Sequence, residues 1–145
     1  MESLLISACF LGVNCKYDGG NNALPEDILA RLREKYRLVP VCPENAGGLP
    51  TPREPSERRG GGVWSRSGRD VTAEYEKGAR IALELARQNA CRAALLKERS
   101  PSCGHERIYD GTFSGVLVPG SGTAAEKLLA AGIPVYGESE VNKLI

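Results

Sequence analysis

Leu4-Leu-Ile-Ser-Ala8, followed at once by Cys9, is the segment from which we derive the fold. A short apolar run that ends at Gly12 and a polar segment, residues 14–22, is typical of a buried strand followed by a loop. Comparable runs recur along the chain, and the candidate strands are residues 37–41, 93–96 and 133–136. Residues 116–118 are a further short strand or an extended loop. Residues 45–69 are rich in Gly, Pro and Arg and show no periodicity, which predicts a long irregular loop.

Helix signals alternate with these strands. Pro25 suits the first turn of a helix that ends near Tyr36. Thr72 can cap a second helix, and the capping-box spacing of Thr123 opens a third, which Gly132 can close. Strands that alternate with helices predict a parallel sheet, because right-handed crossovers return each strand in the same direction. We therefore predict an α/β fold: one three-layer, Rossmann-like domain over residues 1–145 with a mainly parallel sheet.

The charge balance excludes several classes of partner. The 145 residues contain 19 Lys and Arg against 18 Asp and Glu, a net charge of +1. Such a chain has no global field to attract nucleic acid or an acidic membrane. No window approaches the roughly 20 apolar residues of a membrane helix, and residues 1–9 lack the basic region of a secretory signal. We expect a cytoplasmic protein without nucleic-acid or membrane partners.

The five cysteines are informative because of where they fall on this fold. An odd number without any CxxC pair does not suggest a disulfide framework. Cys9 and Cys42 directly follow the first two strands, and Cys103 lies in the loop after the third. The carboxyl ends of parallel strands form one edge, where ligands bind, so these three thiols should converge there. Cys91 precedes its strand and should lie at the opposite edge. The position of Cys15, within a loop, does not assign it a role.

Three converging thiolates suit a zinc ion or a cubane iron–sulfur cluster with one iron left open. For zinc, the single histidine, His105, is the candidate fourth ligand. Glu44 follows Cys42 by two residues and is a candidate acid or base. Ser100 and Ser102, just before Cys103, could orient water, donate to a substrate or attack it.

Several motifs together resemble those of the thiouracil desulfidases (TudS), in their short, single-domain form. They are Ser7-Ala-Cys9, Leu11-Gly12, Tyr17-Asp-Gly19, Val41-Cys-Pro-Glu44, Gly47-Gly-Leu-Pro-Thr-Pro-Arg53, Asp70-Val-Thr72, Lys97-Glu-Arg-Ser-Pro-Ser-Cys-Gly104 and Tyr109-Asp-Gly-Thr-Phe-Ser-Gly115. The resemblance covers essentially the whole chain. An extra helical domain of longer relatives has no counterpart here, so substrate contacts from that domain cannot be carried over.

The resemblance implies a single catalytic iron–sulfur domain. Its [4Fe-4S] cluster would have Cys9, Cys42 and Cys103 as ligands and one open iron, with Cys15 outside the ligand set. The implied reaction is the non-redox hydrolysis of 4-thiouracil to uracil with release of hydrogen sulfide. Glu44 corresponds to the catalytic acid–base, and Ser100 to the catalytic serine, which either attacks the ring carbon or holds the attacking water.

An arginine-rich segment suggests a nucleotide form of the substrate. Residues 53–69 hold five Arg against two Glu, and the glycines at 60–62 let backbone N–H groups approach an anion. We expect Arg53, Arg66 and Arg69 to bind the phosphate of 4-thio-UMP, with Ser102 as a further substrate contact. The alternative function is a zinc- or thiol-based nucleotide-binding module without catalysis.

Overall fold

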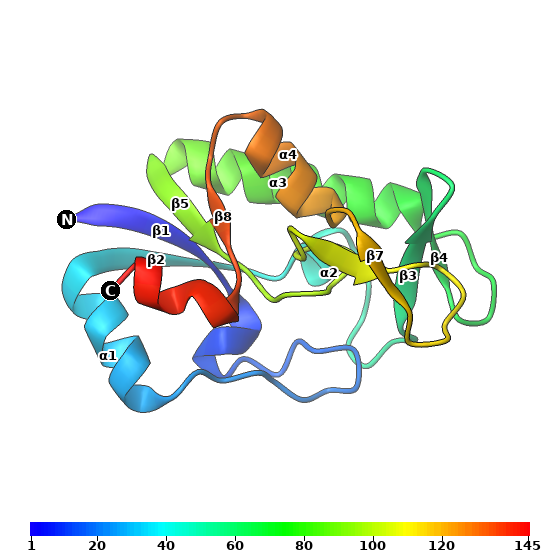
Figure 1. Ribbon diagram of the computed structural model, residues 1–145, viewed down its shortest axis with the longest axis horizontal. Coiled ribbons are helices and arrows are strands. Elements are labelled where there is room, and N and C mark those ends of the chain that lie inside the picture. Colours follow the sequence, from blue (N-terminus) through cyan, green and yellow to red (C-terminus); the bar gives the residue numbers. More distant parts are fainter.

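A four-stranded parallel sheet forms the centre of the computed structural model, which describes all 145 residues (Figure 1). In the order β2-β1-β5-β8, its strands are Tyr36–Val41, Glu2–Ser7, Cys91–Leu95 and Val135–Tyr136. All three neighbouring pairs are parallel. The predicted α/β fold with a mainly parallel sheet is therefore confirmed.

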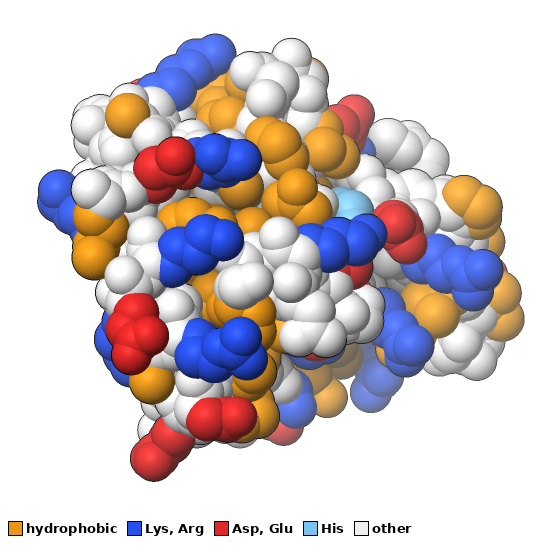
Figure 2. All heavy atoms as spheres, turned by 60° about the vertical axis from the view of Figure 1, so that its left-hand side comes forward, with side chains coloured by type: hydrophobic (Ala, Val, Ile, Leu, Met, Phe, Trp, Pro, Cys, Tyr) orange, Lys and Arg blue, Asp and Glu red, His pale blue; other side chains and the backbone are white.

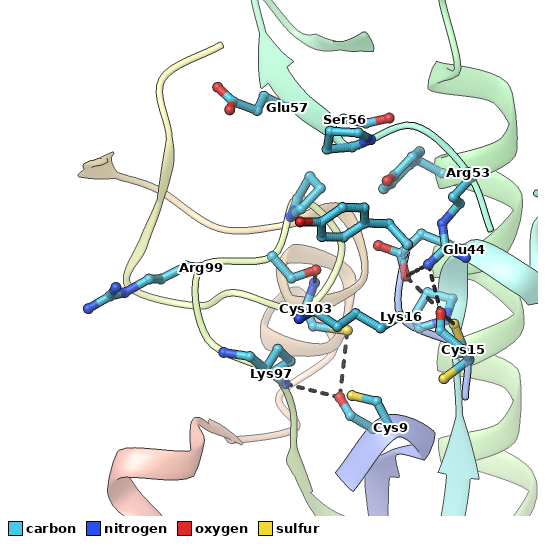
Figure 3. A pocket seen from close by; sticks show the side chains of 18 of the residues that line it. Cys9, Cys15, Lys16, Glu44, Arg53, Ser56, Glu57, Lys97, Arg99 and Cys103 are labelled. Atoms are coloured by element: carbon cyan, nitrogen blue, oxygen red, sulfur yellow. Dashed lines mark hydrogen bonds and ion pairs between the residues drawn. The ribbon is translucent and has the colours of Figure 1, made fainter. Parts of the chain in front are cut away.

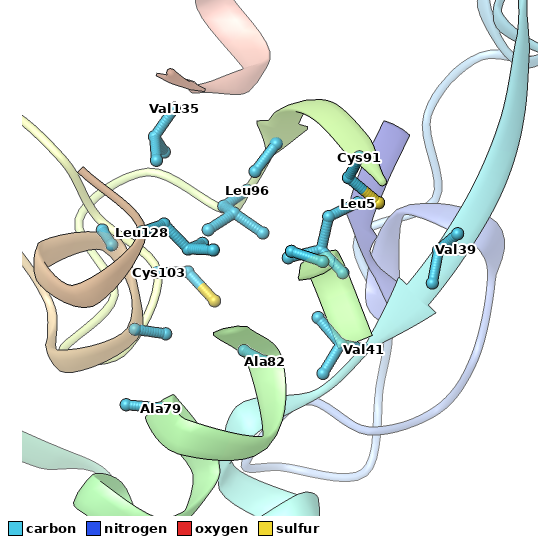
Figure 4. Packing of buried hydrophobic residues seen from close by; sticks show 14 residues of the cluster. Leu5, Val39, Val41, Ala79, Ala82, Cys91, Leu96, Cys103, Leu128 and Val135 are labelled. Carbon is cyan, nitrogen blue, oxygen red and sulfur yellow. The ribbon is translucent and has the colours of Figure 1, made fainter. Parts of the chain in front are cut away.

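Helices cover both faces of the sheet. The long helix α3 (Thr72–Gln88) and α4 (Thr123–Ala130) lie on one face, and α1 (Glu26–Lys35) and the C-terminal 3₁₀ helix η2 (Glu138–Lys143) lie on the other (Figure 1). Successive residues of β1 serve the two faces, since Leu5 packs with α3 and α4 while Leu4 packs with α1. Figure 4 shows Ala79 and Ala82 of α3 facing this first cluster. Helices on both faces give the three layers expected.

Residues 45–69, predicted to be an irregular loop, contain regular structure. The short helix α2 (Pro43–Ala46) begins just before them, and β3 (Ser56–Arg59) and β4 (Gly62–Ser65) form an antiparallel hairpin. The prediction was wrong because both strands have only four residues and β3 is polar, and the main apolar anchor is Val63 of β4, which packs against Val71 and Tyr75. Such packing is tertiary and leaves no periodic signal.

A second hairpin was also missed in part. The predicted strand near residues 116–118 exists as β7 (Leu117–Pro119), but it pairs with β6 (Arg107–Tyr109) rather than with the central sheet. The two hairpins lie together beyond the carboxyl ends of β1, β2 and β5 (Figure 1). They therefore enclose the edge at which the three thiols were expected.

The predicted helix caps were wrong at two starts and correct at one end. Thr72 is the first residue of α3, and its hydroxyl accepts the Val63 N–H at 2.9 Å instead of capping the helix. Gly122 is the N-cap of α4 and makes no side-chain cap bond. Gly132 follows the C-cap of α4 with a left-handed φ of 81°, as predicted. At α3 the Thr72 hydroxyl bonds a residue nine positions away, and at α4 a glycine occupies the N-cap position.

A close contact between α2 and α3 fixes the segment that carries Cys42 and Glu44. A Cβ added to Gly78 of α3 would lie 1.9 Å from the Pro43 carbonyl oxygen. We expect Gly78→Ala to lower the free energy of unfolding of the cluster-free protein by about 1–3 kcal/mol, although alanine normally favours a helix. Urea denaturation measures this, and the exposed neighbour Lys77→Ala should change stability by less than about 0.5 kcal/mol. A Gly78→Ala protein as stable as the wild type would contradict the packing.

The surface agrees with the balanced composition. On the face shown in Figure 2, Lys and Arg side chains alternate with Asp, Glu and apolar groups, and no large area carries one sign of charge. None of the helices is both long and apolar enough to cross a membrane.

Candidate functional site

A cavity of about 490 Å³ opens where the carboxyl edge of the central sheet meets the two hairpins (Figure 3). Its volume is in the range of small-molecule sites, and its place is where parallel sheets bind ligands. Seven of the predicted site residues line it: Cys9, Cys42, Glu44, Arg53, Arg66, Ser100 and Cys103. Ser102 and Arg69 do not.

The sheet register brings the three thiols to this cavity. Ser7, the last residue of β1, pairs with Val41, the last residue of β2, so Cys9 and Cys42 follow adjacent strand ends. Cys103 lies in the turn beyond β5, the other neighbour of β1, and its buried side chain also contacts the core beneath (Figures 3 and 4). Cys91 begins β5 at the opposite edge, as expected. The convergence follows directly from the parallel topology.

Each of the three thiols has its own hydrogen-bond donors. Burial raises the pKa of all three, which disfavours a free thiolate. Donors oppose this: the Asn22 side chain at Cys9, the Asn45 backbone N–H at Cys42, and the Ser7 hydroxyl at Cys103. The Ser102 and Ser7 oxygens lie 3.4 Å and 3.8 Å from the Cys103 sulfur. Sulfurs that are shielded from solvent and have donors are suited to a metal centre, which needs deprotonated ligands.

Cys15 has a different environment although it lines the same cavity. Burial, together with the nearby Cys42 and Glu44, raises the pKa of its thiol to about 12, with no donor to oppose them. The Cys15 carbonyl oxygen accepts a hydrogen bond from the Arg53 guanidinium at 2.9 Å. Cys15 therefore lacks the hydrogen-bond donor that each of the other three cysteines has.

The spread of the sulfurs disfavours a single zinc ion. Tetrahedral zinc holds its thiolates at about 2.3 Å, so their sulfurs are roughly 3.8 Å apart. No three cysteine sulfurs here lie within 4.8 Å of one another. His105, the expected fourth zinc ligand, points elsewhere, with its Nε2 atom 2.8 Å from Glu140 Oε1, and it does not line the cavity. A single tetrahedral zinc ion would need these sulfurs closer together than they lie.

Glu44 extends from α2 to the middle of the site (Figure 3). Its Oε1 accepts the Ser102 hydroxyl at 2.9 Å, and its Oε2 lies 3.7 Å from the Cys42 sulfur and 3.8 Å from the Arg53 guanidinium. The Arg53 side chain is only 9% exposed and donates to backbone oxygens around it, including Pro50 at 3.1 Å. Arg53, expected to bind phosphate, is instead buried and holds the Glu44 carboxylate and the Cys15 carbonyl group in place.

The two serines form a chain that ends at Glu44. The Ser100 oxygen accepts the N–H groups of Ser102 and Cys103, both at 3.1 Å, and lies 3.0 Å from the Ser102 oxygen. Ser102 has a single hydroxyl proton, which it donates to the Glu44 carboxylate. The Ser100 hydroxyl is therefore the donor in the hydrogen bond between the two serines. Ser102 is fully buried, so the expected substrate contact is instead an internal link between Ser100 and Glu44.

Sequence reasoning left several cavity residues without a role. The Lys97 amino group lies 2.5 Å from Glu138, and Arg99 lines the cavity from the same segment. Glu57, Tyr109 and Phe113 line it from the hairpins. Most of these belong to motifs noted in the sequence, but a motif alone does not say which side chains face the cavity.

Comparisons with known proteins found similar chains. The family model for 2-thiouracil desulfurase matches residues 4–140. The uncharacterized protein YbbK of Bacillus subtilis (strain 168) is 40% identical in an alignment of 152 positions, which covers 98% of this chain and 99% of YbbK. The solved structure of the [4Fe-4S]-dependent thiouracil desulfidase TudS superposes with a TM-score of 0.94 at 46% identity, covering 99% of this chain and 95% of that one.

Proposed function

Because the chain belongs to the 2-thiouracil desulfurase family, we propose that it is a [4Fe-4S]-dependent thiouracil desulfidase, a single catalytic domain that replaces the substrate's sulfur with oxygen. The observation that carries this proposal is the convergence of three thiols, two buried and one partly buried, each with a hydrogen-bond donor, beside Glu44 in one cavity. The 46% identity to a [4Fe-4S]-dependent thiouracil desulfidase supports it.

Cys9, Cys42 and Cys103 are the proposed cluster ligands. Cysteine thiolates are the usual ligands of [4Fe-4S] clusters, and three of them leave one iron without a protein ligand. When bound, a cluster of this kind supplies a soft Lewis acid for the thiocarbonyl sulfur, which makes the ring carbon more electrophilic. The Ser7 hydroxyl beside Cys103 holds that ligand in place.

Glu44 is the proposed acid–base group, and Ser100 the proposed catalytic serine. Exchange of C=S for C=O consumes one water and releases one hydrogen sulfide, so protons move and no electron is transferred. The Ser100 oxygen, fixed by two backbone N–H groups, attacks the ring carbon itself or holds the attacking water. The proton released leaves through the Ser102 hydroxyl to Glu44 Oε1, from which it is available to the departing sulfur.

The proposed substrate is 4-thiouracil or its nucleotide 4-thio-UMP. Arg66 and Arg99 line the cavity, and neither has a carboxylate within 4.0 Å. They are available for a phosphate. Arg69 is not, because it lies outside the cavity with its guanidinium 3.1 Å from Glu74.

Sulfide release from defined substrates tests the proposal. Protein purified and reconstituted without oxygen should be brown and release one sulfide for each uracil or UMP formed from 4-thiouracil or 4-thio-UMP; 2-thiouracil tests the position of the sulfur. Arg66→Ala should lower kcat/KM for the nucleotide about 10- to 100-fold more than for the free base. Arg69→Ala is the matched control and should not. Loaded protein that releases no sulfide from any of the three compounds would refute the proposal.

A further inference from the structure

The loop between β6 and β7, residues 110–116, forms one wall of the cavity. It contributes Phe113 and Gly115 to the lining, and Tyr109 at the end of β6 lies beside them. This wall comes from the outer hairpins and contains none of the proposed cluster ligands. Its side chains are therefore free to determine what kind of molecule enters.

Glu57 of β3 holds this loop in place through hydrogen bonds. A single carboxylate oxygen of this buried residue accepts two backbone N–H groups of the loop, from Gly111 at 2.9 Å and from Phe113 at 3.1 Å. Gly111 has a left-handed φ of 94°, and a Cβ there would lie 2.6 Å from the Arg59 Cβ atom. The loop is thus pressed directly against the first hairpin and fixed by a charge-assisted pair of hydrogen bonds.

Phe113 is held in an unusual backbone conformation. Its φ of 58° is in the left-handed region, which bulky side chains rarely adopt. Conformations of this kind persist where surrounding contacts impose them, and they concentrate at binding sites. Here the imposed contacts are the Glu57 hydrogen bond and the Arg66 guanidinium, 5.7 Å from the ring centroid. Together they orient an aromatic ring at the cavity wall.

We propose that Phe113 recognises the flat pyrimidine ring of the substrate by stacking, and that Glu57 positions Phe113 for this contact. The inference rests on the proposed function, because it assumes that a pyrimidine occupies the cavity. Tyr75, another aromatic residue of the lining, is only 2% exposed and offers no ring face to a ligand. Stacking on an aromatic side chain favours the binding of planar rings, whatever hydrogen-bonding groups those rings carry.

Binding of uracil and 5,6-dihydrouracil tests the stacking contact separately from turnover. The two compounds carry the same carbonyl and N–H groups, but the saturated ring is puckered and has no π face. Titration calorimetry on loaded and cluster-free wild-type protein should give a lower Kd for uracil. Phe113→Leu should raise the uracil Kd about 5- to 100-fold and bring the ratio of the two Kd values close to one. Phe113→Tyr should keep the wild-type ratio, and so should the loop control Val116→Ala.

A double-mutant cycle tests the role of Glu57. Glu57→Ala should weaken uracil binding, and Glu57→Gln should restore it, since an amide oxygen can accept the same two N–H groups. If Glu57 acts through Phe113, the double variant Glu57→Ala/Phe113→Leu binds uracil no more weakly than the poorer single variant. Additive losses would remove the positioning role.

Failure of this inference and failure of the proposed function give different results. A wild-type protein without preference for uracil, or a Phe113→Leu protein that keeps the wild-type ratio, overturns the stacking contact. Loaded protein that prefers uracil through Phe113 but releases no sulfide from thiouracils overturns the proposed function instead.

Discussion

Cys42→Ser protein is expected to fold, to bind little or no iron, and to release no measurable sulfide. Cys42 follows β2 at the sheet edge and has a backbone donor, the Asn45 N–H, directed at its sulfur. A serine hydroxyl is a poor ligand for iron in a thiolate cluster, so the cluster loses one of three protein attachments. We expect the rate of sulfide release to fall at least about 10³-fold, because the Lewis acid is lost.

Cys15→Ser is the matched control for this substitution. Cys15 is also buried, lies beside Cys42 and lines the same cavity, but its thiol has no donor that would stabilise a thiolate. We expect this variant to keep most of the iron, the visible absorbance and the activity of the wild type. Iron and acid-labile sulfide per chain, with the visible spectrum, report the result independently of turnover. Equal loss of iron in the two variants would mean that the proposed ligand set is wrong.

Glu44→Gln is expected to retain the cluster and to lower kcat by about 10²–10⁴-fold, the usual contribution of a general acid–base. The change preserves size and keeps an oxygen that can accept the Ser102 hydroxyl, now 2.9 Å from Glu44 Oε1. It removes the ability to accept the proton that the serine chain delivers. The absorbance of the cluster should be unchanged while sulfide release in single-turnover experiments becomes slow.

Glu54→Gln makes the same carboxylate-to-amide change elsewhere on the cavity wall. Glu54 is bound to Ser67, 2.7 Å from its hydroxyl, and has no contact with the serine chain. This variant should retain nearly full activity, which shows that loss of one negative charge from the cavity is not enough to stop the reaction. A Glu44→Gln protein as active as the Glu54→Gln control would exclude Glu44 as the acid–base group.

Much of the fold and the meeting of three thiols could be predicted from the sequence, for a simple geometric reason. Apolar runs and helix signals locate elements of a parallel sheet, and every carboxyl end of such a sheet faces the same edge. Cys9, Cys42 and Cys103 each follow a strand, so their convergence required no knowledge of side-chain packing. Gly132 likewise ends its helix through local backbone freedom.

The outer hairpins were not predictable in this way. The strand Ser56–Arg59 is polar, and it exists because Glu57 binds N–H groups more than 50 residues away and because the loop glycine at 111 lets the two hairpins touch. The same long-range contacts decide which arginines are available. Arg53 and Arg69 are engaged by Glu44 and Glu74, whereas Arg66 remains on the cavity wall.

Periodicity and strand direction are local properties of the sequence, and they were sufficient to predict the parallel sheet, its helical layers and the edge at which the cysteines gather. Long-range contacts were needed to show that Ser102 is an internal link and not a substrate contact, that His105 pairs with Glu140 outside the cavity, and that Phe113 forms part of the cavity wall. The direction of a side chain in an irregular segment depends on hydrogen bonds to residues far away in the chain, and no local pattern records those partners.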